Sequence, residues 1–200
     1  MKIQRYTAAL AMATGLAALI WVCGCASQQT TPAQSQGPGP TPASGDAAKL
    51  QLRNNAASLL RDLLDDEKNV GKVFVIKHGE EVKPLVKLIA AAAEANENEL
   101  LQLTNADPEL NLQALDLPPG EKAARDAEAK SEEHELLFTS GAQFEFNLLL
   151  TQEEAQNYGS HLAKVAAENS SQPEEVATFT RISEGMKHLY EQTVREMRQL

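Results

Sequence analysis

Aromatic residues and cysteines are scarce in this sequence: aromatics make up 4% of its 200 residues, and cysteine occurs only twice. Basic residues are also in deficit, with 18 Lys and Arg against 28 Asp and Glu. A nucleic-acid-binding surface needs clustered Lys and Arg that release counterions from phosphates, so the acidic balance excludes nucleic acid as a partner. The length allows one domain, or one domain with a tail.

The first 24 residues have the pattern of a cleaved secretory signal. Lys2 and Arg5 form a short positive region, and residues 8–22 follow without a charge. This apolar run of about 15 residues is shorter than the ~20 that a membrane-spanning helix needs. We therefore expect residues 1–24 to be removed rather than kept as a transmembrane anchor.

The sequence Val22-Cys23-Gly24-Cys25 resembles the lipobox of bacterial lipoproteins, with an aliphatic residue, a small residue and then a cysteine. Cys25 fits this pattern and Cys23 does not. The resemblance implies that the Cys25 thiol carries a diacylglyceryl group and that the new amino terminus is acylated, for instance with palmitate. Because each buried methylene adds about 0.8 kcal/mol, two or three chains would hold the mature protein on a membrane.

The alternative is an ordinary signal that is cut nearby, for instance after Ala26, and that releases a soluble secreted protein. In similar lipoproteins of diderm bacteria, an Asp directly after the cysteine favours the inner membrane. Ala26 and Ser27 stand there instead. In a diderm organism we therefore expect the outer membrane, with the protein facing the periplasm.

Processing at Cys25 also changes the chemistry that the mature chain offers. Loss of Lys2 and Arg5 takes the net charge from −10 to −12. Since one cysteine is removed and the other carries lipid, disulfides, redox motifs, cysteine nucleophiles and cysteine-based metal sites are excluded.

A tether and one helical domain are expected after the signal. Residues 26–45 contain no charged or large apolar residue and include four prolines. Such a segment cannot bury enough surface to offset the entropy of ordering it, so we expect 25–45 to be a disordered linker behind the lipidated cysteine. From residue 46 to 200 apolar residues recur at helical spacing, which predicts an all-α domain.

The spacing predicts helices at about 46–67, 80–104, 121–139, 142–169 and from 173 onward. The expected fold is an antiparallel, four-helix, ferritin-like up-down bundle, with the 46–67 helix as an extra helix of open placement. Residues 73–76 look strand-like but are too isolated for a sheet, so we expect helix or extended core filler there. In three of the helices, the predicted core faces contain Leu52, Ala56, Leu59 and Leu63; Val82, Leu85, Ile89, Ala92, Asn96, Leu100 and Leu103; and Phe144, Leu148, Thr151, Ala155, Tyr158, Leu162 and Val165.

The stretch 82–197 resembles uncharacterised bacterial envelope proteins with a ferritin-like four-helix bundle. The matching pieces are Val82-Lys83, Asn96 with Leu100, Leu117-Pro118, Ser140-Gly141-Ala142 followed by Phe144, and His188-Leu189. Similar proteins often carry an acid–His pair where this chain has Ala92-Ala93 and Ala155-Gln156. The resemblance therefore implies the fold, but no metal or acid–base role at those positions.

The sequence offers little that is typical of an active site. A ferritin-like di-iron centre needs Glu-x-x-His pairs, and none of the histidines is preceded by Glu at that spacing. Nucleophile-elbow, phosphate-loop and His-Glu-x-x-His motifs are also absent from the sequence. We therefore expect neither catalysis nor a cofactor. His134, Glu154 and His161 are the candidates for a weak metal site, although His134 is expected to be partly buried and His161 to lie on the surface.

These patterns predict a lipid-anchored lipoprotein of the bacterial cell envelope. Its helical bundle would be a non-catalytic binding or scaffolding module, attached to the membrane through Cys25 and able to contact an envelope protein. The alternative is a ferritin-like bundle that binds a metal or a small ligand through histidine and carboxylate groups.

Overall fold

The computed structural model describes residues 45–75, 77–115 and 117–200. The predicted signal peptide, Cys25 and the predicted tether up to residue 44 lie outside the described residues. The described residues belong to one compact unit.

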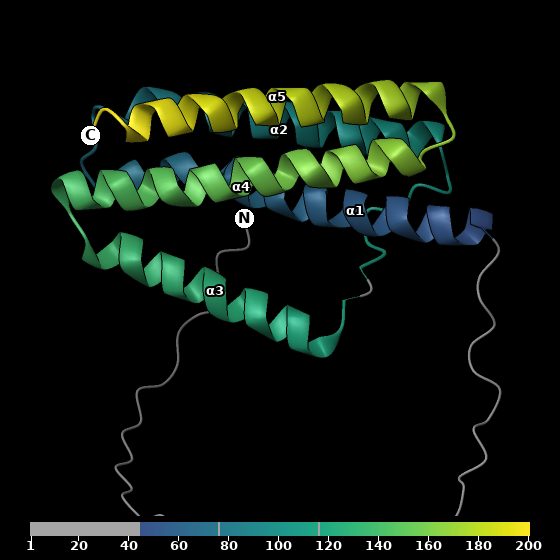
Figure 1. The fold of residues 1–200 in the computed structure, drawn as a ribbon, viewed down its shortest axis with the longest axis horizontal. Helices are drawn as coiled ribbons and strands as arrows, with labels where there is room; N and C mark the ends of the chain where they lie inside the picture. Colours follow the sequence, from purple (N-terminus) through teal and green to yellow (C-terminus); the bar gives the residue numbers. More distant parts are fainter. Residues whose placement is uncertain (1–44, 76, 116) are drawn as a thin grey trace, which may run out of the picture. The chain divides into compact units, whose positions relative to one another are not determined.

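The described part of the chain is helical and contains no strand, which confirms the all-α prediction (Figure 1). None of its helices combines the length and the apolar character that crossing a bilayer requires. Residues 73–75 of the strand-like run belong to a short 3-10 helix, η1. The elements are α1 (Gly45–Glu67), η1 (Val70–Val75), α2 (Lys83–Ala106), α3 (Pro119–Phe138), α4 (Gly141–Asn169) and α5 (Pro173–Met197).

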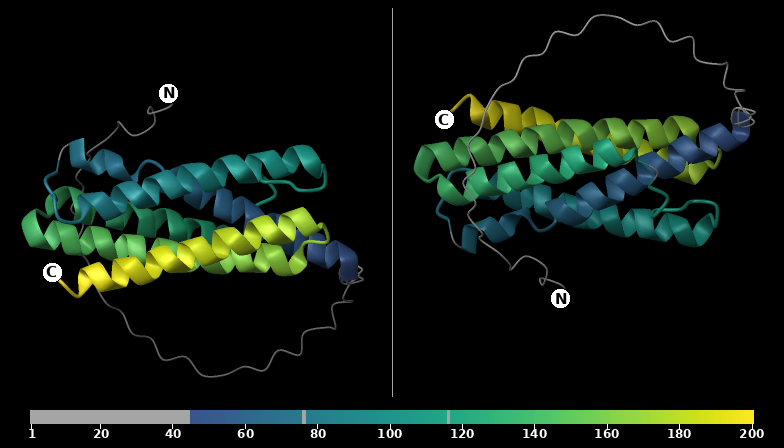
Figure 2. Two further views of the ribbon diagram at one scale, coloured as in Figure 1. Left: turned by 90° about the horizontal axis from the view of Figure 1, so that it is seen from above. Right: turned by 90° about the horizontal axis from the view of Figure 1, so that it is seen from below.

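Four helices pack around one another with every neighbouring pair antiparallel. Helix α1 contacts α2 and α4, and α5 contacts the same two helices from the other side. In the ribbon, α2 and α4 run in one direction and α1 and α5 in the other (Figures 1 and 2). The connection from α2 to α4 therefore returns along the whole bundle, and α3 lies within it.

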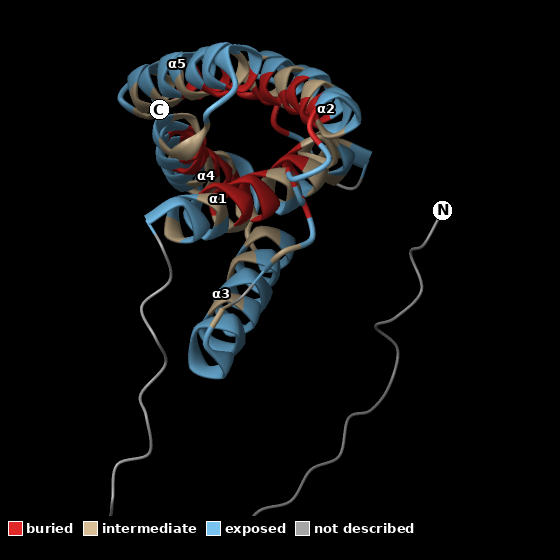
Figure 3. Ribbon diagram, turned by 90° about the vertical axis from the view of Figure 1, so that its right-hand side faces the viewer, coloured by how far each residue is buried: buried red, intermediate tan, exposed pale blue. Residues whose placement is uncertain are grey.

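Apolar side chains of these four helices fill the interior in two clusters. The larger cluster takes residues from all four helices, including Leu60, Leu100, Ala163 and Phe179. The smaller cluster lies where α2 and α4 begin, around Phe144, and packs against η1 and Leu136. Figure 3 shows the buried faces turned toward one another. Burial of apolar surface at about 25 cal/mol per Å² is the main force that holds these helices together.

Helix α3 lies outside this core. This corrects the prediction that the 46–67 helix is the one additional to the four-helix bundle. Among residues 119–138, all of which the structure describes, none is buried, whereas α1 contributes eight buried residues. The helix expected to be extra is therefore a core helix, and α3 flanks the bundle. Composition gives the reason, because α3 carries charged residues around most of its circumference and has no wide apolar stripe.

Two predicted core faces are only partly correct: Ala56 on α1 and Phe144, Leu148 and Leu162 on α4 are buried as predicted, but the centre of the buried face is rotated in each helix. On α1, Leu52 is exposed and Arg53 is buried beside Ala56, Ala57 and Leu60. On α4, the face with Thr151, Ala155 and Tyr158 points toward α3. The core instead receives Leu149, Gln152, Gln156, Gly159, Ala163 and Ala166.

Gly159 lies where α4 packs closely against α1 and α5. A Cβ atom there would stand 2.2 Å from Cε of Met186 on α5 and 2.8 Å from Cδ2 of Leu63 on α1. Only a residue without a side chain fits this contact without displacing its neighbours.

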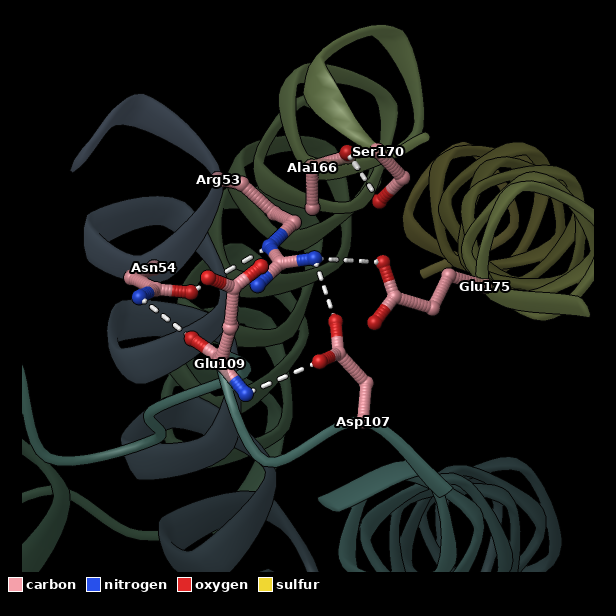
Figure 4. Close-up of polar contacts among 7 residues, drawn as sticks. All are labelled: Arg53, Asn54, Asp107, Glu109, Ala166, Ser170 and Glu175. Atoms are coloured by element: carbon pink, nitrogen blue, oxygen red, sulfur yellow. Dashed lines mark hydrogen bonds and ion pairs between the residues drawn. The ribbon is translucent and has the colours of Figure 1, made fainter. Parts of the chain in front are cut away.

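A buried polar cluster joins α1, the end of α2 and the start of α5 (Figure 4). Arg53 is 3% exposed, and its Nη1 atom donates to Oδ2 of Asp107 at 2.7 Å and to Oε2 of Glu175 at 2.9 Å. Asn54 extends the cluster by donating through Nδ2 to the carbonyl oxygen of Glu109 at 2.9 Å. These contacts fix the loop after α2 against α1.

The two carboxyl groups of this cluster have pKa values that are shifted in opposite directions. Burial, together with the hydrogen bond to Asp107, raises the pKa of Glu175. Burial also acts to raise the pKa of Asp107, but hydrogen bonds from the Glu109 backbone, Glu175 and Arg53 outweigh it and lower that pKa. Asp107 is therefore the stronger acid of the two and the better anionic partner for Arg53, whereas Glu175 holds its proton more readily.

Replacement of Arg53 by Met is expected to lower the free energy of unfolding by about 3–5 kcal/mol, because a charged Asp107 would be left buried without its partner. Urea denaturation measures this loss. Arg61→Met is the matched control, since the Arg61 side chain is 33% exposed and pairs only with exposed Asp62, and its cost is expected to be below ~1 kcal/mol. Equal stability of the two variants would contradict a structural role for the cluster.

Candidate functional site

A cavity lies between α3 on one side and α1 and α4 on the other, and we call it the α3 cavity. Its volume is about 1070 Å³, close to the upper end of the ~300–1,000 Å³ typical of small-molecule pockets. Its apolar lining includes Leu59, Leu63, Val70, Val73, Leu115, Leu117, Leu136, Leu148 and Ala155. The cavity exists because α3 stands off from the core instead of packing into it.

Acidic residues dominate the polar part of the lining. Nine carboxyl groups from α1, α3 and α4 line the cavity, against one lysine and one arginine. The acidic lining residues are Asp62, Asp66, Glu67, Glu121, Asp126, Glu128, Glu132, Glu133 and Glu154.

Both lining cations already have partners on α3. Lys122 Nζ lies 3.2 Å from Oδ2 of Asp126, and Arg125 Nε lies 2.8 Å from Oε1 of Glu121. The Arg125 guanidinium also lies 5.1 Å from the ring centroid of Tyr158 on α4. Because these pairs are local, the unpaired charge of the cavity is negative.

Glu67 and Gln152 form the buried floor of the α3 cavity. Glu67 is the last residue of α1 and is 8% exposed, and Gln152 on α4 is 2% exposed. Gln152 Nε2 donates to Oε1 of Glu67 at 3.4 Å, which is a long hydrogen bond. The other two oxygens, Glu67 Oε2 and Gln152 Oε1, have no hydrogen-bond partner among the described residues. Buried acceptors without a donor are costly and rare in folded proteins, so this pair calls for an explanation.

The surroundings of Glu67 disfavour its charged form. Burial raises the pKa of Glu67 from 4.5 to about 8, and the nearby charges of Asp66 and Glu132 add to this effect while the hydrogen bond from Gln152 opposes it. Burial is also the largest cause of the raised pKa values of Asp62, Asp66 and Glu132. The site thus concentrates carboxyl groups that a cation would stabilise in their charged form.

Helix α3 is attached chiefly at its C-terminal end. Lys77 Nζ donates to the carbonyl oxygens of Leu137 at 2.6 Å and Thr139 at 2.8 Å, and so caps the end of α3. Leu136 packs against the smaller core cluster. Away from this end, the ring of Tyr158 is the main contact of α3 with α4. These contacts hold α3 as the outer wall of the cavity.

The structure separates the histidines that the sequence suggested as candidates. His134 is exposed on α3, where its ring stacks on Phe138 at 4.3 Å between centroids, so the expectation that it is partly buried is wrong. It is exposed because α3 lies outside the core. Glu154 lines the α3 cavity, and His161 is exposed on α4. Within the described ranges, no three His, Cys, Asp or Glu side chains converge to hold a metal ion.

Sequence reasoning missed Glu67 and Gln152. Glu67 ends the acidic run Asp65-Asp66-Glu67, and such runs usually lie on solvated faces, whereas Gln152 lies one residue from the predicted core face of α4. No family model, curated protein or solved structure matches this chain. The arrangement is chemically suited to binding, because an apolar cavity with a few buried, unpaired polar atoms at its floor is typical of a ligand pocket.

Glu67→Gln is expected to remove a pH-dependent loss of stability. Between pH 4.5 and about 8 the native state binds more protons at Glu67 than the unfolded state does, so the free energy of unfolding falls as the pH rises through this window. The variant lacks this titration. The free energy of unfolding of the variant should exceed that of the native sequence by an amount that grows with pH. At pH values above the native pKa of Glu67, this difference should reach roughly a few kcal/mol.

Urea denaturation at a series of pH values measures this difference. Glu153→Gln, which changes the net charge equally on α4 but does not line the cavity, should follow the pH curve of the native sequence. Parallel curves for Glu67→Gln and the native sequence would show that Glu67 has an ordinary pKa.

Proposed function

We propose that this chain is a lipid-anchored lipoprotein of the bacterial cell envelope whose helical domain binds a ligand in the α3 cavity and catalyses no reaction. The observation that carries the binding role is the pair of buried, unpaired oxygens on Glu67 and Gln152 at the floor of an apolar cavity. The Arg53 cluster also has two unpartnered buried atoms, Arg53 Nη2 and Glu175 Oε1, but neither residue lines the α3 cavity. The binding role therefore rests on unpaired oxygens and the cavity together.

The anchor is proposed from the sequence. The order of a short basic region, an apolar run, a small residue and Cys25 matches a lipoprotein signal, and two or three acyl chains would suffice for stable attachment. The proline-rich residues that follow would act as a spacer between the lipid and the domain. For a diderm organism we propose the outer membrane, with the domain in the periplasm.

We also propose a ferritin-like arrangement of the core. Such folds have two antiparallel helix pairs joined by one long crossover. Support comes from the antiparallel contacts of α1 with α2 and of α4 with α5, and from the connection that returns between α2 and α4 (Figure 1). In this arrangement the additional helix is α3, which lies in the crossover, and not α1.

The alternative function, a bundle that binds a metal or a small ligand, comprises two separate candidates. The cavity supports a small organic ligand that contacts carboxylate groups, as the proposal states. A metal held by His134, Glu154 and His161 has no such support, because these residues do not converge. We propose an envelope protein as a second partner, which would contact the exposed surface of the domain.

Cys25→Ala is expected to abolish lipid attachment, so that the protein keeps its signal peptide or is recovered in the soluble fraction. Metabolic labelling with palmitate followed by membrane fractionation measures both effects. Cys23→Ala is the matched control, because Cys23 does not fit the lipobox and its loss should leave labelling unchanged. Membrane retention of a correctly processed Cys25→Ala protein would contradict the proposed anchor.

A further inference from the structure

We infer that the ligand of the α3 cavity is an organic ammonium ion with an apolar body, held through its N–H donors by Glu67 and Gln152. This inference deepens the proposed function and rests on it, since it names the chemical class of the ligand bound at the same site.

The floor of the cavity selects for donors. Gln152 Oε1 is always an acceptor and Glu67 Oε2 is one when its carboxyl group is ionised, and both oxygens are buried and unpartnered within the described part of the chain. An ammonium group carries several N–H donors and no acceptor, so one head group can satisfy both oxygens. A carboxylate ligand has no donor to offer these oxygens, and either a carboxylate or a phosphate would add negative charge beside Glu67.

The charge of the lining selects for a cation. The nine lining carboxyl groups outnumber the two cations, and Lys122 and Arg125 are each paired with an acid one turn away on α3. A cavity lined by one sign of charge concentrates ions of the opposite sign. The charge therefore opposes anions and attracts amines.

The size and the apolar lining select for an organic body. Side chains such as Leu63 on α1, Leu136 on α3 and Leu148 on α4 form the apolar part of a cavity of about 1070 Å³. A bare metal ion would fill little of this volume and prefers a shell of several oxygen ligands. No such shell of three or more acidic or histidine ligands exists among the residues described. An amine with a hydrocarbon or aromatic body would contact the carboxyl groups through its ammonium group and the apolar side chains through its body.

Proton exchange at Glu67 gives an additional signature. The groups around it are Asp66 on α1, Glu132 on α3 and Gln152 on α4, while η1 contributes only Val70 and Val73 to the lining. None of these groups supplies a positive charge, so the empty site holds a proton on Glu67 below its pKa of about 8. Entry of an ammonium ion should expel that proton.

The test is isothermal titration calorimetry of the full chain in phosphatidylcholine nanodiscs, with empty nanodiscs as the blank and 4-phenylbutylamine as the probe. Its comparison ligands are 4-phenylbutanol, which lacks the charge, 4-phenylbutyrate, which reverses it, and methylamine, which lacks the body. The amine is expected to bind at least about tenfold more tightly than each of the others, as a charge-assisted hydrogen bond provides. Near neutral pH the binding heat should vary with the ionisation enthalpy of the buffer, because a proton is released.

Glu67→Gln and Glu153→Gln separate a specific contact from general charge. Both variants remove one acidic group, but only Glu67 lines the cavity. Glu67→Gln should weaken amine binding at least about tenfold, and Glu153→Gln should leave it within about twofold of the native value. Gln has the shape of a protonated Glu, so both variants are expected to fold, and circular dichroism melting checks this.

Equal affinity for the amine and the alcohol, or equal loss in the two variants, would overturn the ammonium inference while leaving the cavity as a binding site. Failure of all four probes to bind would overturn both the inference and the binding role of the cavity. Neither result would affect lipidation at Cys25, which is measured separately.

Discussion

Helix α3 has too little apolar surface to enter a helical core, and the architecture of the domain follows from that deficit. The sequence of α3 places charged residues on nearly all sides, and none of its twenty residues is buried. The core is therefore built from α1, α2, α4 and α5, and α3 is left as an outer wall that Lys77 and Leu136 hold at one end. The space under this wall is the α3 cavity. Without the deficit in α3 there would be no cavity and no unpaired carboxyl group at its floor.

Buried polar residues serve two different purposes in this domain. Around Arg53, contacts with Asp107 and Glu175 tie three helices together, and the two carboxyl groups have pKa values shifted in opposite directions. At Glu67 no cation is present, the only hydrogen bond is long, and one oxygen of the carboxyl group has no donor among the residues described. The first arrangement stabilises the fold. The second leaves buried oxygens without donors, and a ligand can supply those donors, which is why we assign function to it.

The sequence predicts the helices well and their faces less well. Pro173 and Gly141 mark helix starts that the structure places at those residues, and Gly141 adopts a φ of 58°. The core faces of α1 and α4 were misplaced because Arg53 and Gln152 are polar and yet buried, so a search for apolar spacing passes over them. The part of the predicted α4 face that includes Tyr158 is apolar as expected, but it faces α3 and the cavity instead of the core.

The role of Glu67 could not be read from the sequence for a different reason. Its burial depends on α4 and on the stand-off position of α3, neither of which local spacing records, and its acidic neighbours on α1 suggest a solvated turn. The most direct test of the account is a ¹³C NMR titration of the Glu67 carboxyl group in the native sequence, with and without an amine. We predict a midpoint near pH 8 in the empty protein, in line with its raised pKa, and a clear fall in that pKa when the amine is bound. A midpoint near 4.5, the ordinary value for Glu, in both samples would contradict it.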